Sequence, residues 1–336
     1  MTLERAGLDR GAQPVRITDV AALAGVSIGT ASKALNGTGS SGSPHGRGSR
    51  TPPRNSGSSG TPERARCPPR TYTVGMITTD SFGRFSIPVL LGAEDALSAG
   101  QMAVLLCDTR DDHVREAHYL RSLAARGVDG IIVTGRSADP RPPIDVSIPV
   151  VYAFTPSTDP ADVSITLDDA AGSSAVAAHV LTLGRQRVAI VTGPARHQSA
   201  VRRVSGATAV LGSALVGEPL YGEWSERWGR QAVDVLARGS ADVDAIVCGS
   251  DQIARGVCDR LRELGRSVPE DVAVTGFDDW DVMALASRPP LTTVDLRLEE
   301  LGRVAGQALL DLIDGGSAAS AAVTPSLVIR ESTLGA

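Results

Sequence analysis

Hydroxyl and cationic side chains recur at helical spacing near the start of the sequence. Ser27 can cap a short helix on which Thr30, Ser32 and Lys33 supply two hydroxyls and a positive charge. Such side chains hydrogen-bond to phosphate oxygens and to the edges of bases. This stretch therefore suggests binding to DNA.

Two short helices separated by a tight turn are predicted around these side chains. Thr18 can cap the first helix, residues 20–24 give it an apolar stripe, and Gly25 supplies the turn. Two helices at this spacing form a helix-turn-helix unit, which lays its second helix in the major groove of DNA. An ordinary helical hairpin has the same pattern, so the spacing alone leaves both alternatives open.

The residue types in this stretch favour the helix-turn-helix unit. Residues 19–27, Asp-Val-Ala-Ala-Leu-Ala-Gly-Val-Ser, and residues 32–36, Ser-Lys-Ala-Leu-Asn, resemble the N-terminus of the LacI/GalR family of bacterial transcription repressors. The resemblance implies base contacts at residues 28, 29 and 33 and phosphate contacts at 30, 32 and 36. Because Ile28 and Gly29 have no side-chain donor, base readout would rest largely on Lys33. The candidate DNA-binding residues are Thr18, Ser27, Ile28, Gly29, Thr30, Ser32, Lys33 and Asn36.

Length and charge divide the chain into a basic beginning and an acidic body. The 336 residues suggest two or three units, and a hydrophobic fraction of 42% is enough to form cores. The net charge is −5, but the first 70 residues contain ten Lys and Arg against four Asp and Glu. A basic head on an acidic body fits a nucleic-acid-binding arm joined to a second domain. A solvated basic tail fits the same charge distribution.

The segment from Ser40 to Pro69 cannot form a core. It has no Val, Ile, Leu, Met, Phe, Tyr or Trp, and Ser, Gly, Pro and Arg dominate it. Members of the family would have a third helix and a hinge helix at this place. A natural linker and a compensated frameshift are the two explanations for their absence from this sequence. A shifted reading of residues 50–66 permits an Ala-rich run, then Leu-Gly-Phe and Arg-Asn-Ala-Arg-Ala-Arg, close to the family's helix end and hinge. Our hypothesis is the frameshift, and resequencing the gene distinguishes the two.

The cellular location of the protein and the state of its cysteines are predicted from signals that the sequence lacks. No apolar run is long enough to span a membrane, and residues 1–14 lack the hydrophobic core of a secretory signal, so we expect a cytoplasmic protein. Cys67, Cys107, Cys248 and Cys258 lack the spacing of a zinc site or a disulfide framework. We expect Cys107 and Cys248 to be buried thiols on strands.

Strands and helices alternate from Tyr72 onward, which predicts two doubly wound α/β halves with parallel sheets. The expected strands are 74–78, 102–107, 130–133, 150–152, 188–192, 245–248, 272–276 and 326–331. The expected helices are 88–99, 113–125, 169–183, 200–211, 228–237, 252–264 and 298–313. Ligands of such sheets bind beyond the carboxyl ends of the strands, so the cleft between the halves is the expected site.

Three motifs in this body look like the effector domain of the same family, which has the fold of periplasmic sugar-binding proteins. They are residues 248–256, 268–279 and 289–294. The resemblance implies three crossings between halves, with a first subdomain of about 72–155 and 291–318 and a second of about 156–290 and 322–334. The expected organisation is thus a partial helix-turn-helix head at 15–39, the Ser/Gly/Pro/Arg-rich segment at 40–70, and a periplasmic-binding-protein-like domain at 71–336.

The resemblance also assigns candidate effector-binding residues in the cleft. Arg203 occupies the position of an arginine that grips sugar hydroxyls, although a surface arginine of a helix fits the sequence as well. Asp278 follows an expected strand and can accept hydroxyl hydrogen bonds, and Trp224 matches a position that offers an aromatic face to a sugar. The full candidate set is Asp80, Phe154, Arg203, Trp224, Ser250 and Asp278.

Some of these positions depart from the family. Ser250 replaces a common asparagine, and Phe154 stands where many members have a carboxylate. The expected cleft therefore has fewer polar anchors, and the sequence does not identify the effector beyond a sugar as the default class. Asp80 is expected to contribute from the first half.

Catalysis is the alternative function class, and its candidates are few. Asp278 and Asp279, with His179 and His197, could in principle do acid–base work. The sequence has no nucleophile motif, metal-ligand spacing or phosphate loop. We therefore predict no enzyme and no cofactor, but a homodimeric repressor of a two-fold operator, controlled by a small molecule. A cytoplasmic sugar-binding protein without a working DNA-binding head is the second interpretation.

Overall fold

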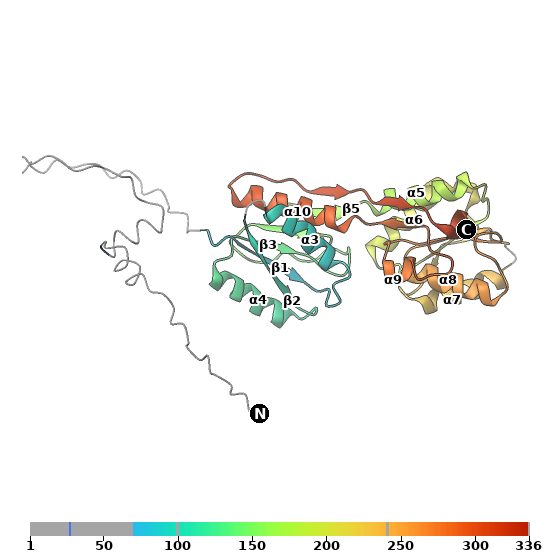
Figure 1. Ribbon diagram of the computed structural model, residues 1–336, viewed down its shortest axis with the longest axis horizontal. Helices are drawn as coiled ribbons and strands as arrows, with labels where there is room; N and C mark the ends of the chain where they lie inside the picture. The colour runs from blue at the N-terminus through green and yellow to red at the C-terminus, as the bar shows by residue number, and fades with distance from the viewer. Residues whose placement is uncertain (1–26, 28–69, 99–100, 240–241, 335–336) are drawn as a thin grey trace, which may run out of the picture. The chain divides into compact units, whose positions relative to one another are not determined.

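The computed structural model describes residue 27 and residues 70–98, 101–239 and 242–334. The chain divides into two units, Met1–Arg66 and Cys67–Ala336. In the first unit Ser27 is exposed. The remaining candidate DNA-binding residues and the segment 40–69 lie outside the described residues, so the predicted helix-turn-helix stays a prediction. The second unit has the two-lobed α/β architecture shown in Figure 1.

The first subdomain is built on a six-stranded parallel sheet with the order β11-β5-β4-β3-β1-β2. Its strands are β1 Thr73–Thr78, β2 Ala103–Asp108, β3 Gly130–Val133, β4 Val150–Ala153, β5 Val163–Leu167 and β11 Ala321–Val323. The central strands β1 and β3 are almost entirely buried, as expected for apolar runs covered on both faces. The strand β2 is at the edge and is more exposed.

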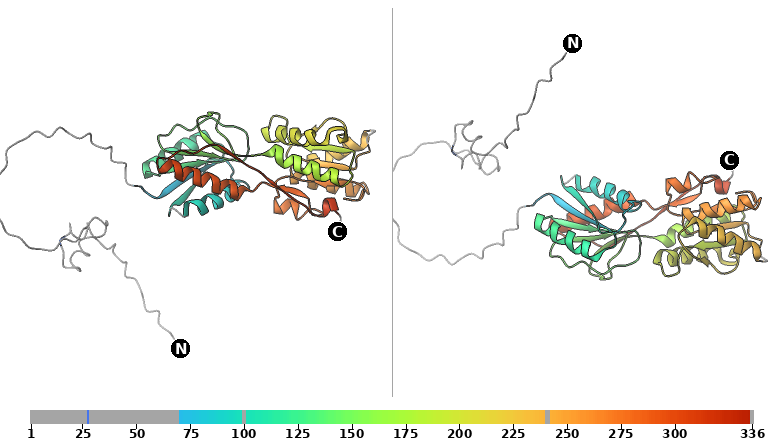
Figure 2. Two further views of the ribbon diagram at one scale, coloured as in Figure 1. Left: turned by 90° about the horizontal axis from the view of Figure 1, so that it is seen from above. Right: turned by 90° about the horizontal axis from the view of Figure 1, so that it is seen from below.

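Helices cover both faces of this sheet (Figure 2). They are α3 Ser86–Ser98, α4 His113–Arg126 and α10 Leu298–Ile313. The helices α3 and α10 touch closely through glycines: a Cβ on Gly92 would lie 1.8 Å from the backbone oxygen of Glu299, and one on Gly302 would lie 2.1 Å from that of Val89. Leu123 of α4 packs on the opposite face of the sheet with Ile77. Alternate residues of the strands therefore face two separate helix layers.

The second subdomain has a four-stranded parallel sheet with the order β7-β6-β8-β9. Its strands are β6 Val188–Thr192, β7 Leu220–Tyr221, β8 Ala245–Cys248 and β9 Ala273–Thr275. Its main helices are α5 Asp169–Thr182, α6 Gln198–Leu211, α7 Glu226–Arg238 and α8 Asp251–Glu263. Gly206 of α6 lies so close to α5 that a Cβ would be 2.2 Å from the oxygen of Ala170.

Three segments connect the subdomains. One joins β5 to α5, and the others contain β10 Thr293–Asp295 and β12 Ser326–Val328, which pair with each other in antiparallel orientation. Short helices α9 Asp281–Ala284 and α11 Glu331–Leu334 complete the second subdomain, with the turn η1 Gly212–Ala214. One apolar cluster continues through this connection, because Leu167, Phe277 and Val294 belong to the same core.

The structure corrects several expectations. The strands β5 and β11 pair within the first sheet, so the first subdomain continues past residues 155 and 318. The predicted strand 326–331 ends at Val328, because Glu331 begins α11. Cys248 is buried as expected, but Cys107 is only half-buried because it lies on the edge strand β2. None of the helices in the described ranges is long and apolar enough to cross a membrane.

Candidate functional site

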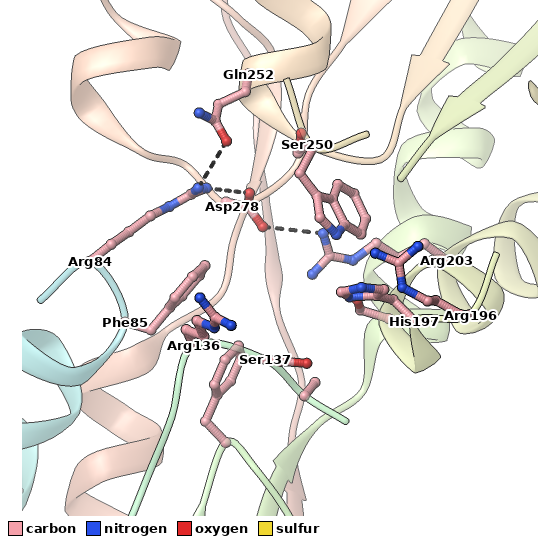
Figure 3. Close-up of a pocket in the computed structure, with 14 residues that line it drawn as sticks. Arg84, Phe85, Arg136, Ser137, Arg196, His197, Arg203, Ser250, Gln252 and Asp278 are labelled. Carbon is pink, nitrogen blue, oxygen red and sulfur yellow. Dashed lines mark hydrogen bonds and ion pairs between the residues drawn. The ribbon is translucent and has the colours of Figure 1, made fainter. Parts of the chain in front are cut away.

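A cavity of about 540 Å³ lies between the two subdomains, beyond the carboxyl ends of strands from both sheets (Figure 3). Its size is that of an ordinary small-molecule pocket. It is lined by Arg84, Phe85, Arg136, Ser137, Ala138, Phe154, Arg196, His197, Ser199, Arg203, Trp224, Ser250, Gln252 and Asp278. The structure therefore brings together five of the six candidate effector-binding residues.

Asp80 is the sixth candidate, and it does not line this cavity. It is buried after β1, where its Oδ2 accepts hydrogen bonds from the backbone N–H groups of Phe85 at 2.7 Å and Ser86 at 3.0 Å. These bonds fix the loop that enters α3 and so hold Phe85 in the cavity wall. Asp80 is thus a residue that positions the site from behind.

An aromatic pair forms the wall of the first subdomain. The rings of Phe85 and Phe154 stack with their centroids 5.0 Å apart and an angle of 17° between their planes. Phe154 follows β4 and has a φ of 71°, while its N–H donates to the oxygen of Ile165. A non-glycine residue at positive φ is strained, and such strain is often found at functional sites. The stacked rings offer an apolar face to a ligand.

Arg203 is buried in the wall of the second subdomain, at 6% exposure, which excludes the surface-arginine alternative. Its Nε donates to Asp169 at 2.7 Å, and its Nη1 donates to the oxygen of Gly249 at 2.7 Å and to Asp278 at 3.2 Å. Burial alone would lower the pKa of this guanidinium, but the charges of Asp169 and Asp278 outweigh burial and raise that pKa. Arg203 is therefore a fixed cation.

Asp278 joins the two subdomains. It accepts from Arg203 through Oδ1 and from Arg84 of the first subdomain through Oδ2, as the dashed lines in Figure 3 show. Arg84 also lies over the ring of Trp280, with its guanidinium carbon 4.2 Å from the centroid. Because both oxygens of Asp278 already accept bonds from arginines, a ligand hydroxyl would have to share or displace them.

A second contact between the subdomains involves Asp139 and the beginning of α6. Its Oδ1 accepts from the backbone N–H of Gln198 at 2.7 Å, and its Oδ2 lies 3.4 Å from Nδ1 of His197. A carboxylate at the N-terminus of a helix interacts favourably with the helix dipole. Two separate contacts that involve a carboxylate, at Asp278 and at Asp139, thus join the two subdomains.

The buried carboxyl group of Asp251 lies next to this site. Asp251 begins α8, accepts hydrogen bonds from Thr293 and from the backbone N–H of Trp280, and is fully buried. Burial, with the nearby charge of Asp278 as the second cause, raises the pKa of Asp251 to about 8. Ser250 caps the same helix, because its hydroxyl accepts from the N–H of Ile253 at 3.3 Å.

Trp224 and Trp228 differ in their surroundings. Trp224 lines the cavity and packs on Gly193, where a Cβ would lie 2.2 Å from the indole. Trp228 packs against the core of the second subdomain, and its indole N–H donates to the oxygen of Thr192 at 2.9 Å. Trp224 therefore has the placement that the sequence suggested, whereas Trp228 does not line the cavity.

Several cavity residues were missed by the sequence reasoning, notably Arg84, Arg136, Arg196 and Gln252. Arg136 follows the end of β3 and Arg196 follows the end of β6. In parallel sheets such loops meet at one edge, so their position directly after apolar runs was the available signal.

The candidate acid–base groups are not assembled into a catalytic arrangement. Asp279 forms an ion pair with Arg330 at 2.8 Å, and His179 lies 3.0 Å from the hydroxyl of Thr333, with its pKa lowered by burial. His197 lies against Asp139 rather than against Asp278. In the described parts of the chain, no group of three His, Cys, Asp or Glu residues could hold a metal ion.

Comparisons with known proteins agree with this fold. Residues 177–333 match the model of the periplasmic binding protein-like domain. The HTH-type transcriptional regulator CelR of Thermobifida fusca is 31% identical over 315 residues, which are 88% of this chain and 91% of that protein. The HTH-type transcriptional repressor PurR of Aliivibrio fischeri is 28% identical over 72% of this chain and 75% of that protein. A solved CelR–cellobiose complex has a TM-score of 0.67 and 25% identity, covering 95% of this chain and all of that one.

Proposed function

Because this chain belongs to the LacI/GalR family of DNA-binding transcription regulators, we propose that a small molecule in the cleft between its subdomains controls its affinity for an operator. The observation that supports this most directly is the cavity of about 540 Å³, whose walls come from both subdomains. A ligand there contacts both halves at once. A sugar is the proposed class, because the solved relative CelR is in complex with cellobiose.

The contacts across the cleft suggest how binding is converted into a signal. Arg84 of the first subdomain reaches Asp278 of the second, and Asp139 of the first reaches Gln198 of the second. A ligand that competes for these groups has a different affinity for each arrangement of the subdomains. Differential affinity is what a ligand needs in order to shift a conformational equilibrium.

The DNA-binding part of the proposal rests on residues 15–39. Phosphate and base contacts are assigned there to Thr18, Ser27, Ile28, Gly29, Thr30, Ser32, Lys33 and Asn36. A two-fold operator requires a homodimer, since each half-site is read by one head. Such a regulator acts on DNA in the cytoplasm.

The first subdomain offers a surface that suits a homodimer. The edge strand β2 exposes Leu105 and Leu106, and large apolar side chains at Phe82, Ile87 and Leu91 are also exposed before and along α3. An exposed apolar patch beside an unpaired strand edge favours association with another protein surface. A second copy of this chain is the proposed occupant.

The composition of residues 40–69 favours one alternative, a sugar-binding protein whose DNA-binding head does not work. The test measures how tightly the protein with the unaltered sequence binds DNA from the region upstream of its own gene, over a series of salt concentrations. A working regulator should bind one DNA sequence tightly, and its affinity should fall steeply as the salt concentration rises. A matched chain carrying the shifted reading of residues 40–69 is the control.

Weak, non-selective binding that becomes selective in the control chain would identify a regulator broken at its hinge. Weak binding by both chains would contradict the proposed function. The effector part is tested by adding candidate ligands to the operator complex and measuring the change in its dissociation constant.

A further inference from the structure

The cavity is rich in hydrogen-bond donors and poor in free acceptors. Four arginines line it, Arg84, Arg136, Arg196 and Arg203, against one carboxylate, Asp278. Each guanidinium has five N–H donors and no acceptor. Figure 3 shows these side chains reaching the cavity from opposite sides.

The two inner arginines are already neutralised by the protein. Arg203 pairs with Asp169 and Asp278, and Arg84 pairs with Asp278 while also donating to Oε1 of Gln252 at 3.4 Å. The positive charges of these two arginines are therefore balanced by the negative charges of two carboxylates. The same contacts occupy the acceptor oxygens that a neutral sugar would use for its hydroxyl groups.

The two outer arginines are different. Within the described ranges Arg196 forms no hydrogen bond or ion pair with any residue, and Arg136 has one ion pair, with Asp111 at 3.1 Å. Both partners of that pair are more than 60% exposed, so it contributes little. Two guanidinium groups at the mouth of the cavity are therefore available to a ligand.

The remaining acidic group near this mouth is occupied. Asp139 accepts from the hydroxyl of Ser137 and from the N–H of Gln198, and it lies against His197. Ser250 uses its oxygen to cap α8. A hydroxyl-rich neutral ligand would find few free side-chain acceptors in this lining beyond the hydroxyl of Ser199, and each of its donors left without an acceptor costs affinity.

We propose that the effector is an anion, a small molecule with a carboxylate or phosphate group held by Arg136 and Arg196. Its apolar face would lie on the stacked rings of Phe85 and Phe154, which are 5.0 Å apart. Guanidinium groups suit this task because their fork geometry matches carboxylate and phosphate oxygens. This inference rests on the proposed function and specifies the charge of its ligand.

The test uses matched pairs of ligands with the full chain and calorimetric titration. The pairs are glucose with gluconate, glucose with glucose 6-phosphate, and cellobiose with cellobionate, with inorganic phosphate as the minimal probe. We expect the acidic member to bind roughly tenfold or more tightly than its neutral partner, as charge-assisted hydrogen bonds are the stronger ones. The carboxylate and phosphate arms distinguish the two kinds of anion.

Two variants show where the anion binds. The double variant Arg136→Gln with Arg196→Gln should remove the preference for the acidic member, so that both members of a pair bind with similar affinity. Arg187→Gln is the matched control, because Arg187 is exposed and does not line the cavity. It should keep the full preference.

Equal or tighter binding of the neutral members would overturn the inference, as would an absence of binding by every anion or a preference that survives in the double variant. The DNA readout separates this inference from the proposed function. A neutral ligand that binds in the cleft and changes operator affinity would refute the anion and support the regulator. A complete lack of effect of bound ligand on operator affinity would refute the regulator itself.

Discussion

Arg203 offers the sharpest test of the energetics of the cleft. Arg203→Met keeps a long apolar side chain but removes the guanidinium from two buried carboxylates, Asp169 at 1% exposure and Asp278. Breaking a buried ion pair by removing one partner costs about 3–5 kcal/mol, since the other charge stays buried. The loss of the contact with the ring of Phe277, 3.8 Å from the guanidinium carbon, adds about 0.5–2 kcal/mol. We expect the free energy of unfolding to fall by about 3.5–7 kcal/mol.

A second substitution separates burial of charge from loss of packing. Asp169→Asn in the Arg203→Met background removes one orphaned charge and should recover about half of the loss, while Asp278 keeps Arg84 as a partner. Arg202→Met, at the neighbouring position of α6, is the control and should change stability by less than about 0.5 kcal/mol. Urea unfolding measures all three. A loss below about 1 kcal/mol for Arg203→Met, or no recovery in the double variant, would refute this reasoning.

Two further predictions concern pH and helix packing. Asp251, with its pKa raised to about 8, keeps a proton that the unfolded chain loses near pH 4. The free energy of unfolding should therefore fall as pH rises from about 4 to about 8, by up to about 1.4 kcal/mol per unit, and Asp251→Asn should flatten this dependence in urea titrations; an equally steep slope in the variant would argue against it. Gly206→Ala places a Cβ 2.2 Å from the oxygen of Ala170 and should cost about 1–3 kcal/mol in thermal or urea unfolding. Ser205→Ala, exposed on the same helix, should cost little, and equal stability of the two variants would contradict the close packing.

The long buried elements were predictable because their sequence patterns are set by burial. Strands 130–133, 188–192 and 245–248 and helix 298–313 have the bounds that their apolar runs indicate. The strand β5, Val163–Leu167, was missed although Ser164 and Thr166 alternate with its apolar residues, which is the pattern of a half-buried strand. The three-residue strands β10 and β11 are too short to show a period and depend on pairing with distant segments.

The placement of Arg203 and Trp224 in the cleft was predicted from the resemblance to the family, and that of Asp278 from its position after an expected strand. All three side chains line the cavity, and Asp278 comes three residues after the end of the buried strand β9. The convergence of Arg84, from the β1–α3 loop, on Asp278 could not be read from the sequence, because 194 positions separate them. Whether a carboxylate such as Asp80 faces a cavity or caps a helix depends on backbone geometry within a few residues.

The topology of the first sheet has a consequence for the synthesis of the chain on the ribosome. The strand β5 remains an unpaired edge until β11, Ala321–Val323, has been made, and the face of α3 stays uncovered until α10 follows. The emerging chain must therefore keep a half-built sheet free of aggregation while the entire second subdomain is translated. A ribosome that stops shortly before β11 would release a chain whose first sheet ends at β5 and whose second subdomain lacks α11.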